Sequence, residues 1–199
     1  MGWKPVLKIS PHSEYDRVAA AAQRLFDTGH GVRFRETVFR AARPECSELP
    51  DLISGNGSKL TGSRWNAPDT IRVLHASDSP ESAVGEALAT YRHFGVPVPS
   101  DLHLVVRGID VDARQFLDLR HGEIRQAIRV SEDRLLATVW EEENAAGREA
   151  ISQAVGRAAS AAGFCGLIAP SAAVPDATNT AVFVDCLGSM GRIVLGGMS

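Results

Sequence analysis

Residues 71–94, IRVLHASDSPESAVGEALATYRHF, join an expected strand to an expected helix and decide the fold class. Residues 71–77 are rich in apolar and β-branched side chains, which predicts a buried strand. Ser79 is a favourable helix N-cap, and Pro80 suits the first helical position because its φ is already helical. We therefore predict a helix over residues 79–94.

The rest of the chain does not alternate strands and helices regularly around this unit. We expect a helix over 14–27, a strand over 37–42, an irregular loop over 44–70, strands over 102–111 and 114–119, helices within 121–163 that include one capped by Ser131 over 132–143, and β segments over 163–172, 180–187 and 192–197. Strands clustered near the C-terminus after a helical middle indicate an α+β fold and not a doubly wound parallel sheet.

Composition places the chain among folded globular proteins of about one domain. Of its 199 residues, 44% are hydrophobic and 23% are charged, and the mean hydropathy is −0.06. Lys and Arg number 21 against 24 Asp and Glu, a net charge of −3, so the chain lacks the basic field of a general nucleic-acid binder.

Location is predicted from what the sequence lacks. It has no run of 18 apolar residues, and the opening MGWKPVLKISPHSEYD has no apolar signal core, so we expect neither a membrane span nor secretion. Cys46, Cys165 and Cys186 are an odd number without C-x-x-C spacing. We interpret them as reduced thiols of a cytoplasmic protein.

The glycine-rich segment 54–66, SGNGSKLTGSRWN, has the G-x-x-x-x-G spacing of a phosphate-binding P-loop. It is not a P-loop, because Ser63 and Arg64 replace the required Lys-Ser/Thr and Pro68 argues against a following helix. Two interpretations of Arg64 stay open. Its planar guanidinium suits a phosphate held by two hydrogen bonds, or it pairs with a surface carboxylate.

Three further residues are ambiguous when considered singly. Glu86 lies at the border of the apolar stripe of its helix, where carboxylates are commonly solvated. Ser171 follows a strand without a G-x-S-x-G motif, so a turn-forming serine competes with a nucleophile. His75 lies inside a strand and is either a core residue or part of a site. The histidines lack metal-ligand spacing, so we predict no metal.

Taken together, these segments resemble the RES domain, a family named for its Arg, Glu and Ser. Arg40 lies in VFRAA, Arg64 in GSRWN, Glu86 in AVGEAL and Ser171 in APSA, in the order of the family. The sequence numbers of Arg64 and His75 differ by eleven, and so do those of His75 and Glu86, which is similar to the family spacing.

The resemblance covers residues 37–186 and has two departures. The family's Gly-Gly before Arg-Trp is Gly62-Ser63 here, and the family's strand tyrosine is His75. Asn179 resembles a family asparagine near the terminal strands. We divide the chain into an N-terminal helical extension, residues 1–36, and a RES domain, residues 37–190.

The resemblance implies an ADP-ribosyltransferase-like fold, with a split mixed β-sheet core and flanking helices. It also implies a toxin that cleaves the nicotinamide–ribose bond of NAD and passes ADP-ribose to inorganic phosphate or water. NAD would be a substrate and not a resident cofactor, and an Xre-type antitoxin would cover the cleft. The chain would form a homo-oligomer or a hetero-oligomer with that antitoxin.

The resemblance implies that Glu86, Arg64 and Ser171 are the catalytic residues, and it gives the site residues these roles. Glu86 would stabilise positive charge that grows at the ribose in the transition state, and Arg40 and Arg64 would hold the pyrophosphate. Ser171 and His75 would line the nicotinamide end. The remaining substrate-binding candidates are Asn179 and Trp65, which is a pocket wall or a core residue.

Two other functions stay open at this stage. The same fold can transfer ADP-ribose to a protein, with the 44–70 loop contacting that target. Alternatively, His75 at the tyrosine position weakens cofactor stacking, and the chain is a catalytically silent module that binds its antitoxin.

Overall fold

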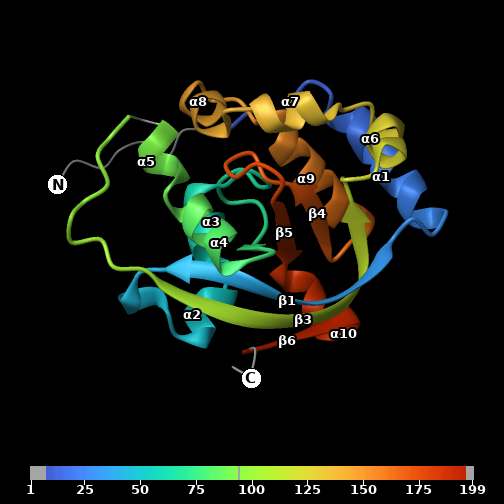
Figure 1. The fold of residues 1–199 in the computed structure, drawn as a ribbon. Coiled ribbons are helices and arrows are strands. Elements are labelled where there is room, and N and C mark those ends of the chain that lie inside the picture. The colour runs from blue at the N-terminus through green and yellow to red at the C-terminus, as the bar shows by residue number, and fades with distance from the viewer. Residues whose placement is uncertain (1–7, 94, 196–199) are drawn as a thin grey trace.

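The computed structural model describes residues 8–93 and 95–195, and within them the strands form one mixed sheet of six (Figure 1). The strands are β1 (Val32–Ala42), β2 (Val73–Ser77), β3 (Val105–Asp118), β4 (Gly166–Pro170), β5 (Thr178–Phe183) and β6 (Gly191–Leu195). Their order is β1-β2-β5-β4-β3-β6, and β1 also pairs with β3. Only β3 and β4 are parallel among these pairs, so the sheet is mixed and its pairings close into a ring with β6 outside.

The long strand β3 changes partners at a break in its backbone. Residues 105–113 pair with β1, Phe116 pairs with both β1 and β4, and residues 117–118 pair with β4. Between them Gln115 has φ of 62°, which regular β-structure does not allow, and the register of β1 shifts between Val32 and Phe34. Across this break β3 passes from its pairing with β1 to its pairing with β4.

Helices cover both sides of the sheet. They are α1 (Tyr15–Asp27), α2 (Leu49–Ile53), α3 (Asn56–Thr61), α4 (Pro80–Ala87), α5 (Ala89–His93), α6 (Gly122–Ile128), α7 (Glu132–Ala137), α8 (Trp140–Ala145), α9 (Ile151–Ala162) and α10 (Leu187–Met190), with 3-10 turns η1 (Pro44–Cys46) and η2 (Val184–Cys186). In Figure 1, α1 and α6 to α9 gather on one side of β4 and β5, and α2 and α10 lie beyond β1 and β3.

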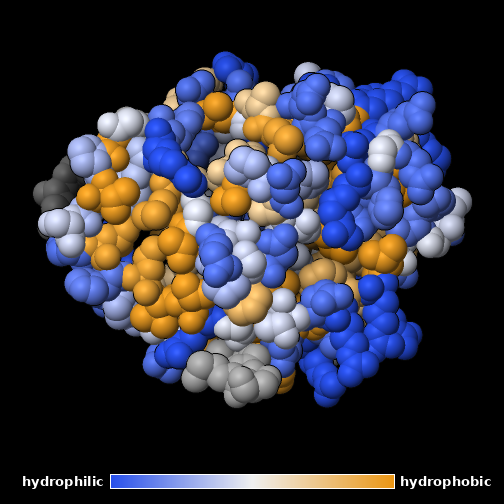
Figure 2. Space-filling model, in the orientation of Figure 1, coloured by the Kyte–Doolittle hydropathy of each residue, from blue (hydrophilic) through white to orange (hydrophobic). Residues whose placement is uncertain are grey.

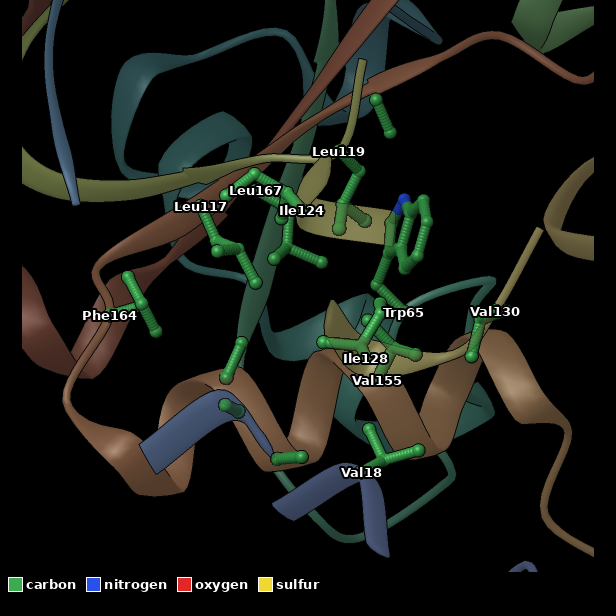
Figure 3. Close-up of a cluster of buried hydrophobic side chains, with 14 of the residues drawn as sticks. Val18, Trp65, Leu117, Leu119, Ile124, Ile128, Val130, Val155, Phe164 and Leu167 are labelled. Carbon is green, nitrogen blue, oxygen red and sulfur yellow. The ribbon is translucent and has the colours of Figure 1, made fainter. Parts of the chain in front are cut away.

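The larger hydrophobic cluster lies between the sheet and helices α1, α6 and α9. The face of α1 that carries Val18, Ala21, Ala22 and Leu25 is buried against α9, whose small residues let the two helices approach closely. Figure 3 shows Trp65 in this cluster beside Leu119 and Ile128. A second cluster, with Phe34, Leu74 and Phe116, fills the other face. Burial of these apolar surfaces is the main favourable term in folding.

The α+β class and the positions of the main elements agree with the sequence predictions. Strands form in every segment where they were expected, and both helix N-caps are made by the predicted serines. The side chain of Ser79 accepts a hydrogen bond from the backbone N–H of Ser82 at 3.0 Å, and that of Ser131 accepts one from Arg134 at 3.2 Å.

Several predicted boundaries were wrong. The 44–70 segment is not an irregular loop, because η1, α2 and α3 form within it. The expected helix over 79–94 is divided into α4 and α5, and the expected helix over 132–143 is divided into α7 and α8. β1 and β3 are longer than predicted, because their mutual pairing extends both strands beyond the apolar alternation on which the prediction depended.

The division into an extension and a RES domain stays a prediction. β1 begins at Val32 and therefore runs across the predicted boundary between residues 36 and 37. Parts of three predicted segments lie outside the described residues: residues 1–7 of the extension, residue 94 of the helix, and residues 196–197 of the last strand.

The cysteines differ from the expectation of three reduced thiols. Cys165 and Cys186 form a disulfide, with their Cα atoms 5.2 Å apart, and Cys46 is free and exposed. The two half-cystines are 21 residues apart, and β5 brings them together, so no local spacing could reveal the pair. Within the described residues, no helix is both long enough and apolar enough to cross a membrane.

The surface is uneven in hydropathy. In Figure 2 hydrophobic residues gather on the side that carries the segment between α5 and β3, and mainly hydrophilic residues cover α1 and α6. Val96 and Val98 in that segment are 53% and 46% exposed. Contiguous apolar surface of this kind is typical of interaction sites.

Candidate active site

The structure contains a pocket of about 610 Å³. Its wall is formed by β1, β2, α4, α5, the turn at residues 63–65, the segment that links α7 to α8, and Asn179 of β5. Arg40, Arg64, His75, Glu86 and Asn179 all border it. Trp65 borders it as well, so folding brings together six predicted site residues that the sequence distributes over 140 positions.

The GSRWN segment forms a tight turn that presents two side chains in different directions. Ser63 and Asn66 exchange backbone hydrogen bonds of 2.8 and 3.4 Å, with Arg64 and Trp65 at the two central positions. Trp65 is 3% exposed and packs in the core, and both Trp65 and Arg64 border the pocket. Trp65 therefore combines the two interpretations, because it is a core residue that also borders the pocket.

A buried glutamine fixes this turn to the helices behind it. Gln153 of α9 is 0% exposed, and its Nε2 donates to the backbone oxygens of Ser63 at 2.9 Å and Asn66 at 3.1 Å. Its Oε1 accepts from the backbone N–H of Ala150 and from Asn144 of α8. The sequence analysis missed Gln153, although a glutamine within an otherwise small-residue helix is the signal that could have found it.

The Arg64 guanidinium is hydrogen-bonded to the backbone through one nitrogen and has no ion-pair partner among the described residues. Its Nη1 donates to the backbone oxygens of Leu135 at 2.9 Å and Thr138 at 3.2 Å, where α7 ends. No carboxylate forms an ion pair with Arg64 within the described residues. Burial lowers the pKa of Arg64, and the nearby carboxylates of Glu86 and Glu141 act in the opposite direction. The predicted surface ion pair of Arg64 is therefore not formed here.

Arg40 is the second buried cation of the pocket. Its Nη1 donates to the backbone oxygen of His75 at 2.7 Å, and its Nε is buried without a hydrogen-bond partner among the described residues. Burial lowers the pKa of Arg40. A guanidinium that is buried without a carboxylate favours an anionic ligand, because an uncompensated buried charge is costly.

Glu86 lies on α4 and is held by two donors at the same oxygen. Ser171 donates its hydroxyl to Glu86 Oε1, and Asn179 donates through Nδ2 to the same atom at 2.5 Å. Ser77 donates to Asn179 Oδ1 at 2.9 Å, which fixes the orientation of that amide. The carboxylate is thus oriented by residues from three separate segments.

Ser171 lies behind Glu86 and not on the pocket wall. It is 8% exposed, and its oxygen accepts hydrogen bonds from the backbone N–H groups of Ala173 at 3.1 Å and Val174 at 2.9 Å. These bonds fill the acceptor positions of the hydroxyl, and its single proton goes to Glu86. The geometry therefore favours a positioning role over that of a nucleophile.

His75 is neutral and hydrogen-bonded within the pocket. Its Nε2 lies 2.7 Å from the hydroxyl of Ser63. Burial lowers the pKa of His75 to about 3, and the charges of Arg40 and Arg64 add to this effect. His75 thus combines both interpretations, because it is a satisfied strand residue that also borders the pocket.

The pocket also contains an aromatic residue that the sequence analysis did not select. Trp140 is half-buried at the start of α8 and borders the pocket, as the buried Trp65 also does. It follows the break between α7 and α8, which the predicted continuous helix over 132–143 concealed. Trp140 is therefore a second tryptophan at the pocket wall.

This fold and site define an α+β protein of one domain with an arginine-rich pocket and one firmly oriented carboxylate. The family model of the RES domain matches residues 37–193. The chain belongs to the RES domain family. None of the curated proteins compared with it matches the chain.

The solved structures with a similar fold include a toxin–antitoxin complex. It is the crystal structure of the M. tuberculosis MbcT–MbcA toxin–antitoxin complex, which superposes with a TM-score of 0.64 at 21% sequence identity. The match covers 90% of this chain and 93% of the other. At this level of identity the comparison establishes the common fold alone.

Proposed function

We propose that this chain is an RES-type toxin that consumes NAD by cleaving its nicotinamide–ribose bond and transferring ADP-ribose to inorganic phosphate or water. The observation that carries the proposal is the placement of Glu86, oriented by two donors, in the same pocket as two arginines without carboxylate partners. Family membership supports it independently. We further propose that the split sheet is of the ADP-ribosyltransferase type.

The reaction separates charge at the ribose. The bond between the anomeric carbon and the pyridinium nitrogen breaks, its electron pair goes to that nitrogen, and neutral nicotinamide leaves. The ribose carbon becomes positively charged until an oxygen of phosphate or water forms the new bond, and with water a proton is released. Glu86 opposes this charge, and because Oε1 is taken by Ser171 and Asn179, Oε2 is the oxygen for the substrate.

The two arginines supply the complementary half of the site. The pyrophosphate of NAD is a dianion, and guanidinium groups bind phosphate oxygens through parallel charge-assisted hydrogen bonds. Arg40 and Arg64 come from β1 and from the turn before β2, so they approach such an anion from two segments. NAD is the substrate in this scheme, and no resident cofactor or metal takes part.

Turnover of NAD by the purified protein, with and without phosphate, tests the proposal. We expect nicotinamide release in both conditions, and ADP-ribose 1-phosphate only where phosphate is present. Glu86→Gln should abolish release while the protein keeps its melting temperature. Glu81→Gln, on the exposed first turn of the same helix, is the matched control and should retain activity. Unchanged NAD at high protein concentration would refute the proposal.

Two further experiments test the two alternative functions. With labelled NAD and a bacterial extract, a labelled protein band would indicate ADP-ribosylation of a protein target. For a catalytically silent module, expression of the wild-type chain and of Glu86→Gln without a partner would give equal growth. We expect instead that only the wild-type chain arrests growth.

We also propose an Xre-type antitoxin as the partner. The similar solved structure is a toxin–antitoxin complex, and the exposed Val96 and Val98 lie in the segment that follows α5, a helix of the pocket wall. A partner seated there would restrict access to the pocket. Co-purification with the product of an adjacent Xre-like reading frame, and loss of NAD turnover in that complex, would support this assignment.

A further inference from the structure

The two positions at which the sequence departs from the RES pattern are in contact with each other. Ser63 stands in place of the family glycine, and His75 stands in place of the family tyrosine. The hydroxyl oxygen of Ser63 lies 2.7 Å from Nε2 of His75. One substitution therefore supplies the hydrogen-bond partner of the other.

The direction of this hydrogen bond is determined by Asn66. Its Nδ2 donates to the backbone oxygens of Ser58 at 2.7 Å and Ala67 at 3.3 Å, so its Oδ1 is the atom that faces Ser63. A carboxamide oxygen only accepts, and a serine hydroxyl has one proton. Ser63 must donate that proton to Asn66, and it can then only accept from His75.

His75 consequently carries its proton on Nε2. A neutral imidazole has one N–H, so the other ring nitrogen, Nδ1, is an unprotonated acceptor. The ring stays neutral at physiological pH because burial and the charges of Arg40 and Arg64 hold its pKa near 3. Since His75 borders the pocket and Ser63 occupies its Nε2 edge, Nδ1 is the hydrogen-bonding atom that remains for a ligand.

We infer that Asn66 and Ser63 fix His75 as the Nε2–H tautomer. The arginine-rich pocket thereby gains one neutral acceptor, Nδ1 of His75. This acceptor selects a ligand group that carries a hydrogen-bond donor, which is a hydroxyl or an amide. Ser63 is the positioning residue of this relay. The proposal rests on the proposed function only in naming NAD, whose carboxamide and ribose hydroxyls are donors of this kind. A carboxylate presented to Nδ1 is disfavoured, because two lone pairs then face each other.

Nitrogen NMR of the full chain labelled in histidine tests the tautomer without any assay of activity. His75→Gln assigns the signals. We expect Nδ1 at the shift of an unprotonated nitrogen and a sharp Nε2–H proton from pH 8 to pH 5. In Ser63→Ala that proton should broaden through exchange with water, and Ser63→Thr should retain it. Ser47→Ala is the control, because it removes a buried hydroxyl that donates to Pro44 outside the pocket.

Two results would overturn the tautomer assignment or the role of Ser63: a proton on Nδ1 in the wild-type chain, or an Nε2–H signal in Ser63→Ala as sharp as in the wild type. The ligand half is tested by adding NAD to labelled Glu86→Gln, which we expect to bind NAD without cleaving it. For this step the protein is labelled in both histidine and arginine, and the Nδ1 signal should shift with the side-chain signals of Arg40 and Arg64.

If the arginine signals move and Nδ1 does not, the selection of a donor group by His75 is refuted. If no pocket signal moves, NAD is not the ligand and the proposed function fails, while the tautomer result stands on its own. In a chain that retains Glu86, Ser63→Ala should raise KM for NAD about fivefold to tenfold with a smaller change in kcat. This split is expected when one ground-state hydrogen bond is lost.

Discussion

Glu86 depends on hydrogen bonds that extend away from the pocket. Ser171 is itself held by the backbone N–H groups of the turn after β4, and Asn179 is held by Ser77. Each donor therefore has a fixed direction before any ligand binds. Preorganisation of this kind is what makes a charged group effective in a transition state, because no reorientation is needed during the reaction.

Ser171→Ala should reduce turnover of NAD without abolishing it. A hydrogen bond to a charged group contributes about 1.5–3 kcal/mol, so kcat/KM should fall about 10-fold to 100-fold. Glu86→Gln should be far less active than Ser171→Ala. Steady-state kinetics of the two variants check this order, and equal loss in both would indicate that Ser171 acts in the chemistry itself.

The contact between Ser63 and His75 predicts that substitutions at these two positions have coupled effects on stability and NAD turnover. At 2.7 Å from the Ser63 hydroxyl, the imidazole leaves no room for the longer phenol of tyrosine, so His75→Tyr alone should lower both stability and NAD turnover. Ser63→Gly combined with His75→Tyr should recover most of the loss. A double-mutant cycle on melting temperature and kcat/KM should give a coupling of about 0.5–3 kcal/mol, and additive effects would contradict it.

His75 should make stability depend on pH in a defined window. Its pKa falls from an ordinary 6.5 to about 3 in the folded chain, so between these values the unfolded chain binds one more proton. Stability therefore rises with pH through this window and is lost on acidification, by up to about 1.4 kcal/mol per pH unit. Urea unfolding from pH 7.5 to pH 5 should show a shallower slope in His75→Gln. The exposed His103→Gln should retain the wild-type slope.

Sequence patterns predicted most of the pocket residues but not the hydrogen bonds that hold them in place. Motif order and spacing selected Arg40, Arg64, His75, Glu86 and Asn179, which the structure gathers around one pocket. They could not reveal that Ser171 lies behind the carboxylate or that Gln153 holds the turn at residues 63–66, because both facts depend on contacts across 85 or more residues.

At the scale of elements, the places where periodicity failed are places where tertiary contacts override propensity. Residues 132–143 have a continuous helical pattern, yet the helix stops at Ala137 and resumes at Trp140. Arg64 takes the freed backbone oxygens of Leu135 and Thr138 at this break. A single-sequence pattern does not record such a distant donor.

Helix α9 and the turn that carries Arg64 touch through a glycine. A Cβ on Gly156 would lie 2.0 Å from the backbone oxygen of Trp65, too close for any real contact. Gly156→Ala should therefore destabilise the chain by about 1–3 kcal/mol in spite of a gain in helix propensity of about 1 kcal/mol. Gly188→Ala in α10 is the matched control, since no atom lies within 4 Å there. Thermal unfolding that ranks both variants alike would contradict this contact.

At the scale of the whole molecule, the same strands and helices hold the pocket residues and form the hydrophobic core. β1, β2 and β5 each contribute a pocket residue and each belong to the ring of strand pairings. α9 binds the turn at residues 63–66 on one face and packs against α1 on another. Support for Arg64 therefore passes through α9 to the N-terminal helix, although the RES model matches only residues 37–193.

The role of α1 can be tested by placing the same charge on its two faces. Ala21 is 2% exposed against α9, and the neighbouring Ala20 is exposed. Aspartate lowers helix propensity equally at both positions, so the difference between the variants isolates burial. Ala21→Asp should destabilise the chain by several kcal/mol and lower NAD turnover, because an unpaired charge enters the core. Ala20→Asp should cost no more than about 1 kcal/mol. If the residues before 37 are instead a separable extension, both variants will unfold at the wild-type temperature and retain full activity.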